Sequence, residues 1–362
     1  TNRFQVAAIS LKRSQQLWSQ PVGKEQGLSH GWNLCPSRPV VSGESLLVRR
    51  MAKTNPELAC FNVATGLIRW TTRNTVNILS DPLVVQDRLF VFTSSTPHEN
   101  GVLSIECSLV DQATGEITAQ QPVILLRNLW DRQLSCQAAV AGTRIVGVCG
   151  GTAFCCDFGG RPKWVRHQLW IPPGQAPAAN EQSPNVPLVI GKRLFVTQPG
   201  VFAVECLDLD TGRRLWQEPI PDLRRLLGFA GPRLVIETAR GWQAYAPESG
   251  KLLWQHEGEQ VLDAQICPAS GDLLVAQREQ QPGDQWRAVL VWLSAETGRE
   301  TARQPLPPFV DKQPMLGPIV VDGDHLWTFF GRGVKDPYRD LFELTPTADP
   351  AQAPRTTASI GQ

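Results

Sequence analysis

Apolar and polar residues alternate along short runs of this chain, and many runs end at a glycine turn that a second run follows. The fullest copy spans residues 204–216, where the alternation leads to Thr211-Gly212 and then to Trp216. A period of two residues is typical of a half-buried strand, and Thr-Gly supplies the positive φ that a tight turn needs. The pattern therefore predicts a β-hairpin with a tryptophan in its second strand.

Copies of this hairpin return along almost the whole sequence. Successive turns lie about 38 to 52 residues apart, which is the range of a four-stranded propeller blade. A second kind of hairpin precedes most turns, and residues 81–92 and 186–196 are clear examples. We therefore expect an all-β chain, a β-propeller of four-stranded antiparallel blades. The turn glycines are Gly66, Gly115, Gly160, Gly212, Gly250 and Gly298, and the tryptophans that follow a turn are Trp18, Trp70, Trp164, Trp216 and Trp254.

The candidate strands favour seven blades, with eight as the alternative, because one strand is left over from seven complete blades. A propeller closes its ring to hide terminal sheet edges, so we expect strands from both termini to share a blade. The closure we favour takes three strands from residues 315–345 and the fourth from Gln15–Val22. Residues 3–10 are then surplus, or displace the C-terminal copy of that strand. If the natural chain extends beyond Thr1, they belong to an eighth blade instead.

A single domain is expected over residues 1–348, as the mature part or a piece of a longer chain. Residues 349–362 are rich in Ala, Pro and Thr, and we expect them to form a flexible tail. Residues 222–227 are a candidate for one helical turn, because Pro221 and Gly228 bound them tightly.

The five recurring tryptophans are expected to pack between blades. A tryptophan in the fourth strand can lie against the glycine turn of the next blade and bury about 150–250 Å² of surface. Equal spacing favours this structural role over an aromatic binding surface, so these tryptophans and the turn glycines are read as blade-docking residues.

Composition narrows the classes of function. Apolar residues make up 42% of the 362 residues and charged residues 19%, which suits a soluble chain with a packed core. A net charge of +1 argues against nucleic-acid binding, which favours a strongly basic face. No apolar run is long enough to span a bilayer.

Nine cysteines are scattered along the chain without any C-x-x-C pair, which argues against zinc and thioredoxin-like sites. Cys60 and Cys206 both stand six residues before a turn glycine, so we interpret them as small core residues. One or two disulfides remain an alternative. The five histidines show no metal-ligand spacing.

The repeat, with Asp208, Thr211, Gly212 and Trp216 as its fullest copy, resembles that of the pyrroloquinoline-quinone-like β-propeller proteins. The resemblance covers roughly residues 4–345. It extends to two branches, the quinoprotein alcohol dehydrogenases and the non-enzymatic propeller lipoprotein of the outer-membrane β-barrel assembly machine. Fold follows from this resemblance more securely than function does.

For the quinoprotein branch, the resemblance implies a quinone above the propeller axis, a calcium ion and a catalytic aspartate. No set of residues matches that constellation, and Asp322-Gly323-Asp324 is better read as a turn. Some enzymes of the superfamily carry a disulfide between adjacent cysteines. Cys155 and Cys156 are adjacent, but side chains of neighbouring strand residues point to opposite faces.

A candidate partner surface lies where the copies stop agreeing, in and near the connections between blades. Basic and aromatic residues gather there, and Trp and Arg are frequent in interface hot spots. A loop that merely caps its own blade is the alternative. The candidate residues are Arg132, Arg166, His167, Trp170, Arg224 and Arg225.

Two functional hypotheses follow. The first is a monomeric, non-catalytic propeller scaffold that binds a protein or peptide in the periplasm or elsewhere outside the cytoplasm, with an anchor upstream as one possibility. It needs no cofactor, metal or nucleic acid. The second is a quinoprotein-like oxidoreductase, with pyrroloquinoline quinone and Ca²⁺, or a sensor that binds a sugar or another small ligand in the axial funnel.

Overall fold

The computed structural model describes residues 3–10, 15–24, 38–51, 56–72, 76–94, 102–127, 136–167, 185–198, 201–258, 261–267, 270–281, 285–306, 315–316, 320–322, 325–331, 340–344 and 356–359. The chain divides into two compact units, residues 1–8 with 17–219 and residues 9–16 with 220–362, and each is described by itself. Within these described ranges every regular element is a β-strand, and no helix could cross a membrane.

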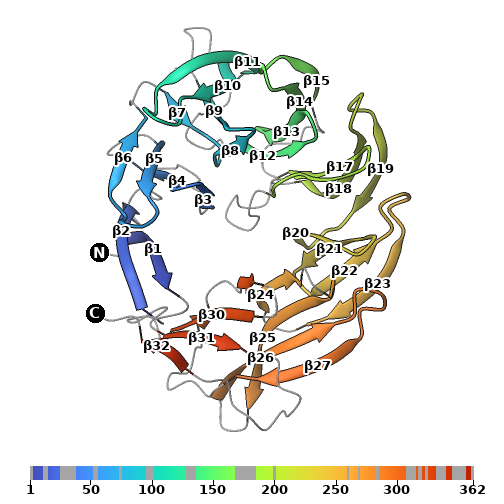
Figure 1. Cartoon of the computed structure of the whole chain (residues 1–362). Coiled ribbons are helices and arrows are strands. Elements are labelled where there is room, and N and C mark those ends of the chain that lie inside the picture. Colours follow the sequence, from blue (N-terminus) through green and yellow to red (C-terminus); the bar gives the residue numbers. More distant parts are fainter. Residues whose placement is uncertain are drawn as a thin grey trace. The chain divides into compact units, whose positions relative to one another are not determined.

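The first unit holds four antiparallel sheets whose strands follow chain order (Figure 1). They are β3-β4-β5-β6 (Val40–Ser42, Ser45–Met51, Pro56–Asn62, Ile68–Thr71), β7 and β8 with β9-β10-β11 (Asn77–Ile78, Leu83–Val85, Arg88–Ser94, Val102–Val110, Ile117–Arg127), β12-β13-β14-β15 (Cys136–Ala141, Arg144–Cys149, Thr152–Asp157, Pro162–His167) and β16-β17-β18-β19 (Leu188–Ile190, Arg193–Gln198, Val201–Asp208, Arg214–Pro219). Strands β1 (Arg3–Ser10) and β2 (Gln15–Lys24) pair in a two-stranded sheet near the chain start.

The second unit repeats the same plan in three sheets. They are β20-β21-β22-β23 (Leu223–Ala230, Arg233–Thr238, Gly241–Tyr245, Leu252–Glu257), β24-β25-β26-β27 (Val261–Ile266, Leu273–Gln281, Gln285–Leu293, Glu300–Pro305) and β28 and β29 with β30-β31-β32 (Met315–Leu316, Val320–Asp322, His325–Gly331, Asp340–Leu344, Thr356–Ser359). The predicted four-stranded antiparallel sheets are therefore confirmed. The number of blades stays a prediction.

The predicted closure of the last sheet is wrong. Its fourth strand is β32, which pairs with β31 and places Ser359 opposite Asp340. Strand β32 comes from residues 349–362, the segment expected to be a flexible tail, and Gln15–Val22 belongs to β2, which pairs with β1. Residues 345–362 contain neither the Thr-Gly turn nor the tryptophan of the repeat, so their sequence does not indicate a strand.

The expected helical turn at residues 222–227 is also wrong, because strand β20 occupies this segment. Its register slips between Leu223 and Arg225 and again between Leu226 and Gly228. Each irregularity adds a residue to one strand and changes which side chains face the core. As a result, Leu223 and Leu226 are both buried three positions apart, a spacing that imitates a helix.

The recurring Asp-x-x-Thr-Gly turns are held together by the first side chain of the motif. Asp208 Oδ1 accepts hydrogen bonds from the backbone N–H groups of Asp210 and Thr211 at 3.1 and 2.8 Å, and from the Thr211 hydroxyl at 2.7 Å. Asn62 does the same in the first copy. Gly212 follows with a φ of 70°, in the left-handed region that favours glycine.

The Asp208 carboxylate makes this turn sensitive to acid. The hydrogen bond from the Thr211 side chain, followed by backbone N–H donors, lowers the pKa of Asp208 below its ordinary value. The stabilisation is present above the unfolded pKa of about 3.9 and is lost as the pH falls through the folded pKa. Asp208→Asn keeps an oxygen acceptor, as Asn62 shows, but cannot titrate. We expect its melting temperature to fall less between neutral pH and about pH 3 than that of the wild type, and an identical fall would contradict this.

Four of the recurring tryptophans pack against the glycine turn of the following sheet. The pairs are Trp18 with Gly66, Trp70 with Gly115, Trp164 with Gly212, and Trp254 with Gly298. In each pair the indole N–H also donates to the carbonyl three residues before the glycine, at 2.8, 2.8, 3.0 and 2.9 Å respectively. A side chain on these glycines would collide with the ring, so glycine is required here by space as well as by φ.

The core within each unit consists of apolar layers shared by successive sheets. One layer joins β3–β6 to the next sheet through residues such as Leu58, Cys60 and Leu89. Another joins β20–β23 to β24–β27 through Val235, Trp254 and Val291. The eight described cysteines are all buried thiols, and Cys35 lies outside the described residues.

Candidate functional site

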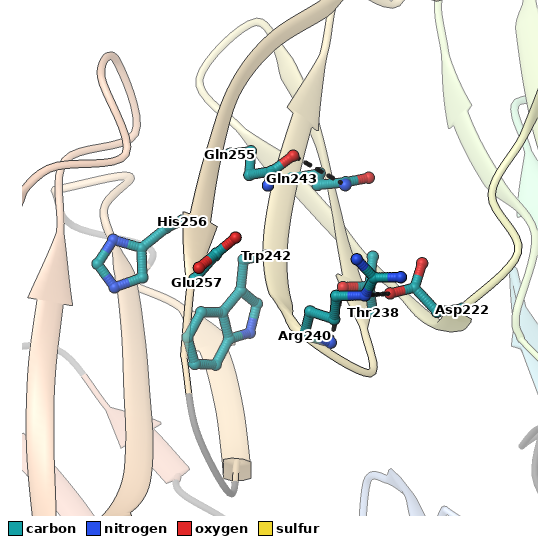
Figure 2. A pocket seen from close by; sticks show the side chains of 8 residues that line it. All are labelled: Asp222, Thr238, Arg240, Trp242, Gln243, Gln255, His256 and Glu257. Atoms are coloured by element: carbon teal, nitrogen blue, oxygen red, sulfur yellow. Dashed lines mark hydrogen bonds and ion pairs between the residues drawn. The ribbon is translucent and has the colours of Figure 1, made fainter.

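A small polar pocket lies at one end of the sheet β20–β23, where β20 begins, β21 turns into β22, and β23 ends. Its volume is about 160 Å³. Figure 2 shows Asp222, Thr238 and Arg240 on one side of the pocket and Trp242 opposite them. The lining residues are Asp222, Thr238, Arg240, Trp242, Gln243, Gln255, His256 and Glu257.

The turn between β21 and β22 shapes the pocket. Thr238 accepts a hydrogen bond from the Arg240 backbone N–H at 3.2 Å, and its hydroxyl donates to the Gly241 carbonyl at 3.2 Å. Gly241 has a φ of 140°, and a Cβ there would collide with the backbone carbonyl of His256. The turn therefore brings Arg240 close to Asp222, and the Arg240 Nε atom lies 3.5 Å from Asp222 Oδ2.

Charges of both signs reach solvent at this pocket. The Arg240 side chain is 83% exposed and that of Asp222 is 25% exposed. Glu257 at the end of β23 is exposed and adds a second carboxylate. In the middle of the sheet, Gln243 accepts a hydrogen bond from the Tyr245 hydroxyl at 2.7 Å, which orients its amide.

Trp242 forms the apolar side of the pocket. The residue is only 1% exposed, and its ring lies against Gly258, where a Cβ would collide with it. The indole N–H has no acceptor among the described residues. A buried N–H group without a hydrogen-bond partner is uncommon in folded proteins.

His256 makes a contact with the following sheet. Its Nδ1 lies 3.0 Å from the Gly298 carbonyl, and because a carbonyl only accepts, Nδ1 carries the proton. In Figure 2 the ring points away from Asp222 and Arg240, on the other side of the strand. The lining of the pocket thus offers charged and amide groups that could form hydrogen bonds and ion pairs with a polar ligand.

The described members of the predicted partner surface all lie in strands. Arg166 and His167 lie in β15 of the first unit, and Arg224 and Arg225 lie in β20 of the second, not in connections between sheets. Trp170 and Arg132 lie outside the described residues.

These basic residues differ in their contacts. Arg166 lies 3.7 Å from the buried Glu205, and Arg225 lies 2.8 Å from Glu237 and 3.2 Å from Asp263, so both guanidinium groups are held in internal ion pairs. Arg224 is exposed, which leaves it the better candidate for an external contact.

The structure also locates the adjacent cysteines and the acidic segment that the sequence pointed to. Cys155 and Cys156 face different core layers, with Val146 and Leu194 around one and Phe92 and Ile145 around the other. Asp322 ends β29 and pairs with His325 of β30, while Gly323 and Asp324 lie outside the described residues. In the part of the chain that the structure describes, no group of three or more His, Cys, Asp or Glu side chains is placed to hold a metal ion.

The pocket itself was not predicted from sequence. Its residues come from β21, β22 and the turn between them, from β23 and from the segment just before β20, so they are spread over the sequence of the sheet. In the sequence, Gly241-Trp242 departs from the alternation of apolar and polar residues in the neighbouring strands, and this departure could have drawn attention to the pocket.

Comparison with known proteins places the chain by family and by fold. The family model of outer membrane protein assembly factor BamB matches residues 2–226. The structure of BamB from Moraxella catarrhalis is similar with a TM-score of 0.55 and 15% identity, over 91% of this chain and 96% of that one. A search of curated proteins found no match.

Enzymes of known structure share the fold as well. Quinohemoprotein alcohol dehydrogenase from Comamonas testosteroni is similar with a TM-score of 0.55 and 12% identity, over 90% of this chain and 67% of that one. A europium-containing methanol dehydrogenase has a TM-score of 0.50 and 10% identity, over 81% of this chain and 75% of that one. Identities this low show the β-propeller fold alone.

Proposed function

Because this chain belongs to the family of outer membrane protein assembly factor BamB, we propose that it is a non-catalytic propeller scaffold that binds a protein or peptide outside the cytoplasm. The observation that carries the proposal is the family match over residues 2–226. The name of the family points to the assembly of outer-membrane proteins as the process served, and to a component of that process as the partner.

The geometry of the described residues supports binding over chemistry. The tryptophans and glycines of the repeat are occupied in contacts between sheets, and the aspartates in turns. The pocket on β20–β23 offers exposed charges of both signs, which suits a peptide segment that carries charged side chains. Arg224 in the same sheet is exposed and available to a carboxylate.

Partner binding can be tested with the tagged chain and detergent-solubilised outer membranes. We expect co-purification of an outer-membrane assembly component, and a several-fold lower recovery with Arg224→Glu. Arg213→Glu is the matched control, because Arg213 is an exposed arginine in a turn outside the candidate surface. Absence of any assembly component from the wild-type sample would contradict the proposal.

The Pro-rich segment before β16 needs its own variant. A chain that lacks residues 172–184, which lie outside the described residues, should recover less partner if this segment joins the interface. Equal recovery would remove the segment from the proposal while leaving the rest intact.

A scaffold should not respond to the cofactors of the quinoprotein enzymes. With pyrroloquinoline quinone and Ca²⁺ added, we expect an unchanged melting temperature and no dye-linked oxidation of alcohols. A ligand present at 100 times its Kd would stabilise the folded state by about 2.7 kcal/mol, which a thermal-shift assay detects easily. A saturable shift accompanied by turnover would support the oxidoreductase instead.

A further inference from the structure

Four buried cysteines gather in one core layer between two successive sheets of the first unit. They are Cys107 in β10, Cys136 in β12, Cys149 in β13 and Cys156 in β14. This junction lacks the recurring tryptophan, because Ala119 stands at that position in β11 and Gly160 faces the side chains of Gln121 and Cys107. The four thiols thus occupy the layer at a place where the usual contact between sheets is missing.

Cys136 and Cys149 are direct cross-strand partners in the antiparallel pair β12–β13. The backbone N–H of Cys136 donates to the Leu79 carbonyl at 3.1 Å, and so not to Cys149. The two residues therefore form a pair without mutual backbone hydrogen bonds. Counting from the two-residue turn at Gly142 gives the same result, because Ala141 and Arg144 flank that turn and the two kinds of pair alternate from there.

Pairs without mutual hydrogen bonds bring their side chains closest together, with Cα atoms about 4.5 Å apart, within the range of about 4.4–6.8 Å that a disulfide spans. The two cysteines also belong to the same core layer, so both side chains lie on the same face of the sheet. We propose that Cys136 and Cys149 are joined by a cross-strand disulfide when the chain folds under oxidising conditions.

Other pairings of these two cysteines fit the backbone less well. Cys156 pairs with Ile145, four residues along β13 from Cys149, which corresponds to roughly 13 Å along the strand. Cα atoms more than about 7 Å apart cannot be bridged without backbone movement. Cys155 faces the opposite side of the sheet. Cys107 lies in β10 of the neighbouring sheet and is not a strand partner of Cys136 or Cys149.

The chemistry is thiol–disulfide exchange. A disulfide oxidant accepts the two electrons, the Cys136 and Cys149 thiols lose their protons and form one S–S bond, and the oxidant leaves as two thiols. Cys136 is 0% exposed and Cys149 2% exposed in the folded chain. Burial raises the pKa of the Cys136 thiol well above its ordinary value, so it is not a nucleophile once folded. The bond must form before β12 and β13 are covered, and it is then protected from reductants.

The inference rests on the proposed location outside the cytoplasm only for the source of the oxidant, so the test is made with purified protein. The reduced chain is refolded in a mixture of reduced and oxidised glutathione, denatured, alkylated without reductant, and cleaved with trypsin and chymotrypsin. Cleavage after Arg144 separates the two cysteines, and cleavage after Phe154 separates Cys149 from Cys155. We expect a linked pair of peptides, residues 133–144 and 145–154.

Variants give the matched controls. Cys136→Ala or Cys149→Ala should abolish the linked peptides and leave the other cysteine alkylated, while Cys60→Ala, at another buried strand position, should retain them. Refolding in reductant instead of the glutathione mixture should lower the melting temperature of the wild type and of Cys60→Ala, and not that of a variant that carries both Cys136→Ala and Cys149→Ala. Alkylation of both cysteines in the refolded wild type, or linkage of Cys136 to a different cysteine, would overturn the proposal. Failure to find a binding partner would leave this result untouched.

Discussion

Replacing Trp254 with alanine should lower the free energy of unfolding by about 3–5 kcal/mol, the range for large aromatic side chains removed from packed interiors. Trp254 is 7% exposed, its ring lies against Gly298, and its indole N–H donates to the Ala295 carbonyl at 2.9 Å. Truncation opens a cavity between the sheets β20–β23 and β24–β27 and removes the donor from that carbonyl. Urea unfolding followed by circular dichroism measures the loss.

Two variants separate the causes of this loss. Leu253→Ala changes the neighbouring residue, which is 46% exposed, and should alter stability by no more than about 0.5 kcal/mol. Trp254→Phe retains most of the apolar ring but lacks the indole N–H, and should cost about 0.5–1.5 kcal/mol for the hydrogen bond, with a further loss for the smaller ring. If Trp254→Ala were as mild as Leu253→Ala, the tryptophan would not be a structural contact between sheets.

Repetition explains why so much of the fold can be predicted from sequence. A strand, a Thr-Gly turn and a tryptophan recur with the same spacing, so each copy indicates how the others are used. Cys206, Asp208 and Trp216 look like a site when read alone, but their counterparts show a core residue, a turn acceptor and an aromatic contact. In the structure Cys206 stands directly opposite Trp216, as Cys60 stands opposite Trp70.

Departures from the repeat are where sequence reasoning fails, for physical reasons that the structure makes visible. In β20 two register irregularities bury Leu223 and Leu226, and the resulting spacing resembles a helix. At the C-terminal end, β32 pairs with β31 through backbone hydrogen bonds that leave no pattern in the side chains. Strand pairing at an edge depends on an available neighbour more than on residue type.

The candidate site could not be predicted for a related reason. Asp222, Arg240 and Trp242 belong to different segments of the chain, and they meet only because the start of β20, the β21–β22 turn and the end of β23 lie at the same end of the sheet. Arg225, by contrast, is a candidate for the partner surface because the sequence pattern assigns it to a connection between blades. In the structure it lies in a strand and forms ion pairs with Glu237 and Asp263. Composition marks such residues as candidates, but only their contacts show whether they are available to a partner.

Replacing Gly298 with alanine should destabilise the chain by about 2–5 kcal/mol, through two separable effects. Its φ of 67° is left-handed, and a Cβ there would lie 2.5 Å from Cε3 of Trp254. Gly231→Ala is the matched control, because Gly231 has a φ of 59° and open space around a Cβ. It should show only the backbone cost of about 1–2 kcal/mol.

The difference between the two glycines isolates the contact with the tryptophan ring, and a double-mutant cycle can assign it. In a Trp254→Ala background the obstructing ring is gone, so Gly298→Ala should cost no more than Gly231→Ala does. The coupling energy between positions 254 and 298 should then be about 1–3 kcal/mol, within the range for residues in direct contact. Equal costs of Gly298→Ala in both backgrounds would mean that the glycine is required for its φ alone. Because the same pair of residues recurs at Trp18, Trp70 and Trp164, a measured coupling at one junction predicts a comparable one at the other three.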